Sequence, residues 1–141
     1  MPVPVRTAGS ASPLFLVHGR LGQALVSTHF LNLLGDGQLV EALQARGLDG
    51  LTAPHATVEA MAAEYLRAMR RVKPDGPVFM LSSRARIMAS GNDDLRRLFT
   101  GQSERFAVTV GHTEILDPHN PRFVAALAEC LARIRATVVA A

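Results

Sequence analysis

The sequence predicts an α/β fold, a three-layer sandwich in which a mainly parallel sheet of about four strands lies between helices. Continuous apolar runs at 14–17 and 78–81 are typical of strands that are covered on both faces, and the largely apolar residues 106–110 predict a final strand. Apolar residues recur at helical spacing between and after these runs, most clearly over 58–72 and 121–134. Alternating strands and helices favour parallel strands joined by helical crossovers.

A chain of 141 residues fits one domain. Residues 1–12 are small, interrupted by proline and aperiodic, so we expect a flexible leader. The domain then occupies residues 13–141. A hydrophobic content of 48% with 19% charged residues describes a globular protein and not a disordered one.

The first half of the chain contains one clear strand, one helix and one ambiguous strand. The run at 14–17 ends in a turn at His18-Gly19. Residues 25–34 have an apolar stripe that fits a helix. Residues 38–45 are predicted as a second strand, although their leucine and alanine content would suit a helix equally well.

Two longer helices have clear start signals. Thr57 is a suitable N-cap for the helix over 58–72. The apolar residues that fall on one face of this helix are Val58, Met61, Ala62, Tyr65, Leu66, Met69 and Val72, and we expect Met61, Tyr65 and Met69 to face the sheet. Asn120 and Pro121 together mark the start of the last helix. The residues expected to face inward from that helix are Phe123, Leu127, Cys130, Leu131 and Ile134.

Composition excludes several classes of function. Cys130 is the single cysteine, so no intrachain disulfide can form, and its apolar neighbours predict a packed thiol. The net charge is +3, and no basic block is interleaved with aromatic residues, so we expect no nucleic-acid partner. The apolar runs are too short to span a membrane, and the start lacks a signal-peptide pattern. We therefore expect a cytoplasmic protein without a membrane partner.

Several stretches follow one another in the order of a known domain. They resemble the type I thioesterase domains that end polyketide and nonribosomal peptide synthetases, and the residues around Gly111-His112 are similar to the end of that domain. The stretches that carry the resemblance are Pro13-Leu-Phe-Leu-Val-His-Gly19, Leu43-Gln-Ala-Arg-Gly-Leu-Asp-Gly50, Thr57-Val-Glu-Ala-Met-Ala-Ala-Glu-Tyr65 and Val72-Lys-Pro-Asp-Gly-Pro77.

The resemblance implies a fold, an activity and a partner. The fold would be a reduced α/β-hydrolase. The activity would be release of acyl or peptidyl groups from the phosphopantetheine thiol of a carrier protein, with no cofactor of the enzyme's own. His112 matches the general base, which takes the proton of the nucleophilic serine and returns it to the leaving thiol.

The middle of that domain is missing. No Gly-x-Ser-x-Gly occurs in the chain, although this motif places the nucleophile on a strained strand-to-helix turn. Where the family has the serine elbow, an acid-bearing strand and a lid, Val78 to Leu81 run directly into Ser82-Ser83. An internal deletion, natural or engineered, accounts for this junction.

Three residues are candidates to replace the lost nucleophile and acid. Ser82 and Ser83 lie at the expected end of a strand, but no glycine flanks either one, so plain loop hydroxyls are the alternative. Asp93 lies between the serines and His112, in the order that a hydrolase needs. A helix cap is the alternative role for Asp93.

The turn after the first strand resembles the family's oxyanion hole. His18, Gly19 and Arg20 occupy it, and a backbone N–H there would stabilise the developing negative charge. Bulky Arg20 replaces a glycine usual in the family. The histidines show no His-x-x-x-His or paired Cys/His spacing, so we expect no metal site.

Two functions follow as hypotheses. One is a thioesterase-like protein whose catalysis is impaired or lost because the elbow is missing. The other is a non-catalytic binding or assembly module that interacts with a carrier protein or with itself. Loss of the lid and of neighbouring strands would expose apolar surface and an unpaired sheet edge, so we also expect a homodimer.

Overall fold

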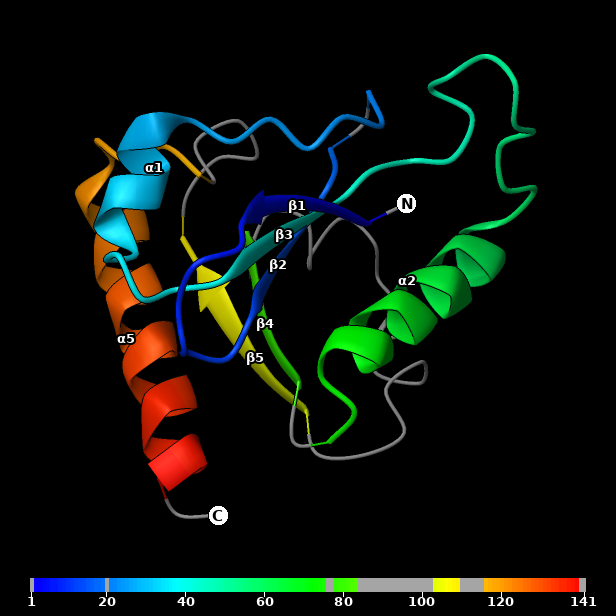
Figure 1. Ribbon diagram of the computed structural model, residues 1–141. Helices are drawn as coiled ribbons and strands as arrows, with labels where there is room; N and C mark the ends of the chain where they lie inside the picture. The colour runs from blue at the N-terminus through cyan, green and yellow to red at the C-terminus, as the bar shows by residue number, and fades with distance from the viewer. Residues whose placement is uncertain (1, 20, 76–77, 84–102, 110–115, 140–141) are drawn as a thin grey trace. The chain divides into compact units, whose positions relative to one another are not determined.

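The computed structural model describes residues 2–19, 21–75, 78–83, 103–109 and 116–139, which form two compact units (Figure 1). Unit 1 comprises Met1–Ser27 and Leu34–Asp75, and unit 2 comprises Thr28–Leu33 and Gly76–Ala141. Each unit contains its own strands, its own helices and its own buried residues.

Unit 1 contains a three-stranded sheet in the order β1-β3-β2. β2 (Leu14–Val17) runs parallel to β3 (Val40–Leu43), as the sequence predicts for neighbouring strands. β1 (Pro2–Arg6) pairs with β3 in the antiparallel direction. The strand predicted over 38–45 is therefore confirmed, in a shorter form.

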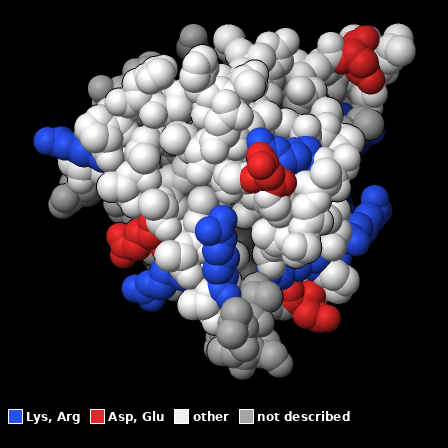
Figure 2. Space-filling view, turned by 60° about the vertical axis from the view of Figure 1, so that its left-hand side comes forward, with Lys and Arg blue, Asp and Glu red and all other residues white. Residues whose placement is uncertain are grey.

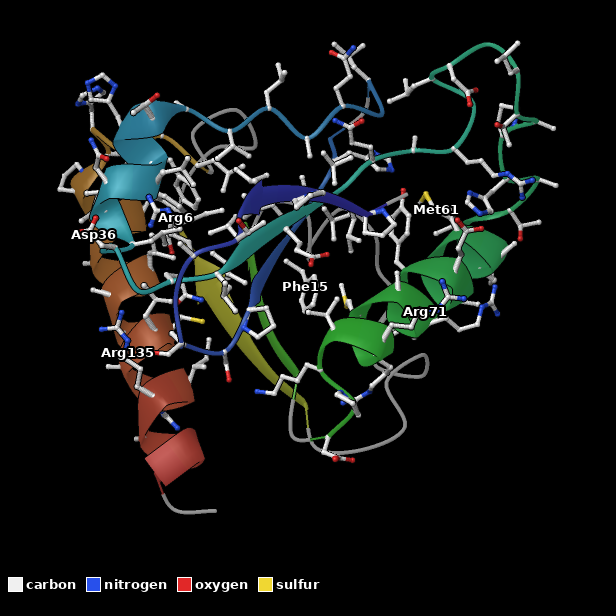
Figure 3. All side chains as sticks on the ribbon, in the orientation of Figure 1. Arg6, Phe15, Asp36, Met61, Arg71 and Arg135 are labelled. Carbon is white, nitrogen blue, oxygen red and sulfur yellow. The ribbon has the colours of Figure 1, made fainter. Side chains whose placement is uncertain are left out.

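Strand β1 lies within the segment for which we expected a flexible leader. Pro2 and Pro4 are compatible with a strand here because β1 is at the edge of this sheet, where a missing N–H leaves no ladder bond unmade. The Arg6 guanidinium donates to the Gly35 carbonyl at 2.5 Å (Figure 3). The Ala11 N–H donates to the Gly37 carbonyl at 3.1 Å. These bonds attach residues 2–11 to the loop that precedes β3.

Helix α2 (Val58–Val72) packs on this sheet through the middle of the predicted face, whereas Val58 and Val72 at its two ends are exposed. The Thr57 hydroxyl accepts a hydrogen bond from the Ala60 N–H at 3.1 Å, which confirms the predicted N-cap. Tyr65 and Ala68 are buried against Leu43. The residues that pack around this cluster are Phe15, Met61 and Met69 (Figure 3).

Unit 2 contains β4 (Val78–Ser83) and β5 (Ser103–Val108), which pair in parallel from Val78↔Ser103 to Ser83↔Val108. α5 (Pro121–Val139) packs on this pair of strands (Figure 1). Asn120 caps α5 through bonds from the N–H groups of Arg122 and Phe123, as predicted. Of the residues predicted to face inward, Phe123, Leu127, Cys130 and Leu131 are buried, and Ile134 is half-buried.

The predicted helix over 25–34 is shorter than expected, because α1 spans only Thr28–Leu33. Leu25 and Leu33 of the predicted apolar stripe are exposed, whereas Phe30 is 2% exposed. Phe30 stacks on Phe123 with ring centroids 6.1 Å apart, which joins α1 to α5 within unit 2.

Basic and acidic side chains are interspersed on the face seen in Figure 2. Among the described residues, no helix is long and apolar enough to cross a bilayer.

Candidate functional site

The His18-Gly19 turn follows β2 at the carboxyl end of the parallel strands of unit 1. This is the end at which open α/β sheets bind ligands. The Gly19 carbonyl accepts hydrogen bonds from the His18 ring at Nδ1 (2.6 Å) and from the Gly22 N–H (3.0 Å). A carbonyl only accepts, so Nδ1 of His18 carries a proton. The Gly19 carbonyl is therefore bonded both to the residue before it and to a residue that follows in the turn.

Gly22 brings this turn against the loop that follows β3. Its φ is +79°, a backbone conformation that favours glycine, and its carbonyl accepts from the Ala45 N–H at 2.9 Å. A Cβ atom at Gly22 would lie 2.9 Å from the Cβ of Ala45. A glycine is therefore required where the two loops meet.

Two groups of this turn, one side-chain nitrogen and one backbone N–H, have no hydrogen-bond partner among the described residues. The Nε2 atom of His18 is buried without a partner. The N–H of Gly19 is unpaired as well, and Gly19 is exposed. A backbone N–H without a backbone acceptor, on an exposed residue, is the kind of donor that an oxyanion hole requires. The arrangement is therefore compatible with the role that the resemblance implies for this turn.

Tyr65 connects α2 to the ends of both parallel strands. Its hydroxyl donates to the Gln44 carbonyl, one residue after β3, at 2.9 Å. Its ring meets His18 edge to face, with centroids 5.8 Å apart, and His55 in the same manner at 6.4 Å. Burial raises the pKa of the Tyr65 phenol, and the nearby Glu64 charge adds to the shift, so the hydroxyl stays a donor.

His55 and Glu64 form a hydrogen-bonded pair beside this tyrosine. The Nε2 atom of His55 lies 2.8 Å from a carboxylate oxygen of Glu64, and the two side chains are 10% and 31% exposed. An ionised carboxylate only accepts, so the imidazole donates. The hydrogen bond from His55 lowers the pKa of Glu64 below its usual range.

The lowered pKa of Glu64 predicts a small pH-dependent contribution to stability. The carboxylate stabilises the folded state above its ordinary pKa of about 4.3, and this contribution is lost as the pH falls through the lowered folded-state value. We expect Glu64→Gln to lower the free energy of unfolding by less than about 1 kcal/mol at pH 7, because the pair is partly exposed to solvent.

Denaturant midpoints of the wild type and of Glu64→Gln, measured at pH 7 and at acidic pH, test this expectation. The two midpoints should converge as the carboxylate becomes protonated. A difference that stays constant or grows on acidification would show that the Glu64 charge does not contribute to stability.

The candidate serines lie inside a strand. Ser82 and Ser83 are the last two residues of β4 and are paired with Ala107 and Val108 of β5. A nucleophile elbow is instead a sharp turn between a strand and a helix. His112, Asp93 and Arg20 lie outside the described residues, so their roles stay predictions.

Several residues of this cluster were not among the sequence candidates. Tyr65 was predicted only as an inward-facing core residue, and the contacts of His55, Glu64 and Gln44 were not predicted. The spacing of these residues in the sequence follows no catalytic motif. The one signal of their cluster was the ionisable Glu64 directly before Tyr65, a predicted core residue. Among the described residues, no group of three or more His, Cys, Asp or Glu side chains could hold a metal ion.

Comparison with known proteins places part of the chain among the peptide synthetases. Malpibaldin synthetase of Mortierella alpina is 38% identical over 78 residues, which are 55% of this chain and 1% of the synthetase. Nonribosomal peptide synthetase btyA of Aspergillus terreus is 37% identical over 75 residues, 53% of this chain and 8% of its own length. About half of this chain is related to nonribosomal peptide synthetases.

A relative from Bacillus subtilis is also a nonribosomal peptide synthase. The dimodular nonribosomal peptide synthase of Bacillus subtilis is 34% identical over 79 residues, which cover 56% of this chain and 3% of that protein. The chain thus spans less than a tenth of the length of each of these three relatives. No family model matches the sequence.

Proposed function

We propose that this chain is a thioesterase-like protein, related to the domains that hydrolyse acyl or peptidyl thioesters on carrier proteins, in which catalysis is impaired or lost. The identity of 34–38% to nonribosomal peptide synthetases carries the proposal, because it associates the chain with the enzymes that the resemblance implies. The substrate would be held on a phosphopantetheine arm, and the protein would act in cytoplasmic secondary metabolism.

The proposed fold is a reduced α/β-hydrolase. Two pairs of parallel strands, β2–β3 and β4–β5, support it, as do α1 and α2, which lie between β2, β3 and β4 along the chain. The turn with His18 and Gly19 at the end of β2 also suits that fold, since its oxyanion hole lies after a strand.

Loss of catalysis follows from the chemistry of the reaction. Attack on a thioester carbonyl needs a nucleophile that is held beside a base, and here no Gly-x-Ser-x-Gly presents one. Ser82 and Ser83 lie in extended backbone within β4 and not in a turn. Removing the nucleophile of a serine hydrolase lowers kcat by about 10⁶-fold, and the residual rate arises from the oxyanion hole and from binding.

Hydrolysis of a short acyl thioester tests this proposal. We expect the protein to release thiol about 10⁶-fold more slowly than a serine thioesterase with an intact nucleophile, and we expect His112→Ala to behave like the wild type. Turnover in the wild type that disappears in His112→Ala would contradict the loss of catalysis, while it would support the relation to thioesterases.

A non-catalytic binding or assembly module is the second candidate, and exposed apolar side chains favour it. They lie in the loops after β2 and β3, which meet at Gly22 and Ala45. Exposed apolar surface of this kind marks contacts with other proteins. A carrier protein or a second copy of the chain would be the partner. The exposed residues are Leu21 (76% exposed), Leu25 (77%), Leu48 (47%) and Leu51 (92%).

A homodimer is the expected assembly. Among the described strands, β2 lies at the edge of the unit 1 sheet, and an unpaired edge recruits another strand. Light scattering at tens of micromolar should give twice the chain mass of 15.1 kDa. A mass equal to that of a single chain at this concentration would rule out the dimer.

A further inference from the structure

Two histidines that are far apart in the sequence lie side by side in unit 2. The ring centroids of His29 and His119 are 5.6 Å apart, and the ring planes are tilted by 53°. His29 belongs to α1, and His119 belongs to the turn that precedes α5. Both residues are exposed, so their imidazoles are open to solvent and to dissolved ions.

The backbone on each side of this pair is held in place. Phe30, the neighbour of His29, is 2% exposed and stacks on Phe123, which is 0% exposed. The His119 N–H donates to a carboxylate oxygen of Asp117 at 2.9 Å. The Asn120 side chain caps α5 directly after His119. The packing and the capping that hold α1 and α5 therefore also hold the two imidazoles close together.

We propose that His29 and His119 form a two-imidazole binding site for a divalent transition-metal ion such as Zn²⁺, Ni²⁺ or Cu²⁺. Imidazole nitrogen suits these metals. Two imidazoles bound to one ion at 2.0–2.1 Å have ring centroids about 5 Å apart, close to the separation of this pair. Both rings are exposed, so they can rotate about their side-chain bonds toward a shared ion.

The site has two protein ligands, and water would fill the other positions of the ion. This agrees with the finding that no group of three or more ligating side chains occurs among the described residues. A bound ion would link α1 to the start of α5 and would stabilise the folded state by mass action. Motif spacing did not predict the site because it considers only ligands that are close in sequence.

Titration of the full chain with Ni²⁺, followed by calorimetry and by thermal unfolding, tests the proposal. We expect one equivalent of Ni²⁺ to bind and to raise the Tm. His29→Asn and His119→Asn should each weaken binding on the order of 100-fold, since each removes one of two linked ligands.

His55→Asn is the matched control, because it removes a histidine outside the pair, and it should retain the wild-type affinity. Both test residues are exposed, so the metal-free Tm of their variants should stay near that of the wild type. Absence of Ni²⁺ binding to the wild type would overturn the proposal. Equal loss of affinity in His55→Asn, or unchanged affinity in either test variant, would overturn it as well.

Discussion

Replacing Phe123 with alanine is expected to lower the free energy of unfolding by about 3–5 kcal/mol, the usual effect of removing a fully buried phenylalanine. Phe123 is 0% exposed, and its ring stacks on Phe30 at an interplanar angle of 28°. The truncation therefore leaves a cavity between α1 and α5 and removes an aromatic contact in addition to apolar burial.

Denaturant unfolding of three variants separates this effect from a general effect of mutation. Phe123→Leu retains most of the apolar volume and should be much less destabilised than Phe123→Ala. Glu129→Ala lies at an exposed position of the same helix and should unfold close to the wild type. If Phe123→Ala unfolded at the wild-type midpoint, Phe123 would not be a core residue of unit 2.

The two long helices were predictable because their signals are local. Thr57 and Asn120 each bond to N–H groups within three residues, so a cap is visible in a short window of sequence. The inner face of α5 follows from apolar spacing alone, and Cys130 is buried as predicted. Helices of this kind carry enough information within one segment to be recognised without knowledge of the rest of the chain.

Strand β1 was not predictable from its own residues. Proline at two of its five positions argues for irregular structure. The strand exists because of distant partners, namely β3 and the Gly35 carbonyl that accepts from Arg6. Pairing between residues far apart in the sequence leaves no local pattern. The exact ends of β3 and β4 likewise depend on their pairing with other strands, so they could not be predicted from local sequence.

The candidate site was predicted in part. His18 and Gly19 lie in a turn at the carboxyl end of β2, where the resemblance places them. The bonds from Tyr65 to Gln44 and from His55 to Glu64 arise only when α2 packs on the sheet, so no sequence motif contains them. The roles of all the candidate site residues stay predictions that rest on sequence, namely those of His18, Gly19, Arg20, Ser82, Ser83, Asp93 and His112.

Active-site labelling measures whether the protein contains a working serine nucleophile, and the proposed function requires that it does not. A fluorophosphonate reacts with a serine only when a neighbouring base activates it. Intact-protein mass spectrometry after incubation with this reagent should therefore give the unmodified mass, beside a serine hydrolase that is labelled to completion. Rapid stoichiometric labelling of Ser82 or Ser83 that is lost in His112→Ala would contradict the claim and would identify a functional catalytic triad.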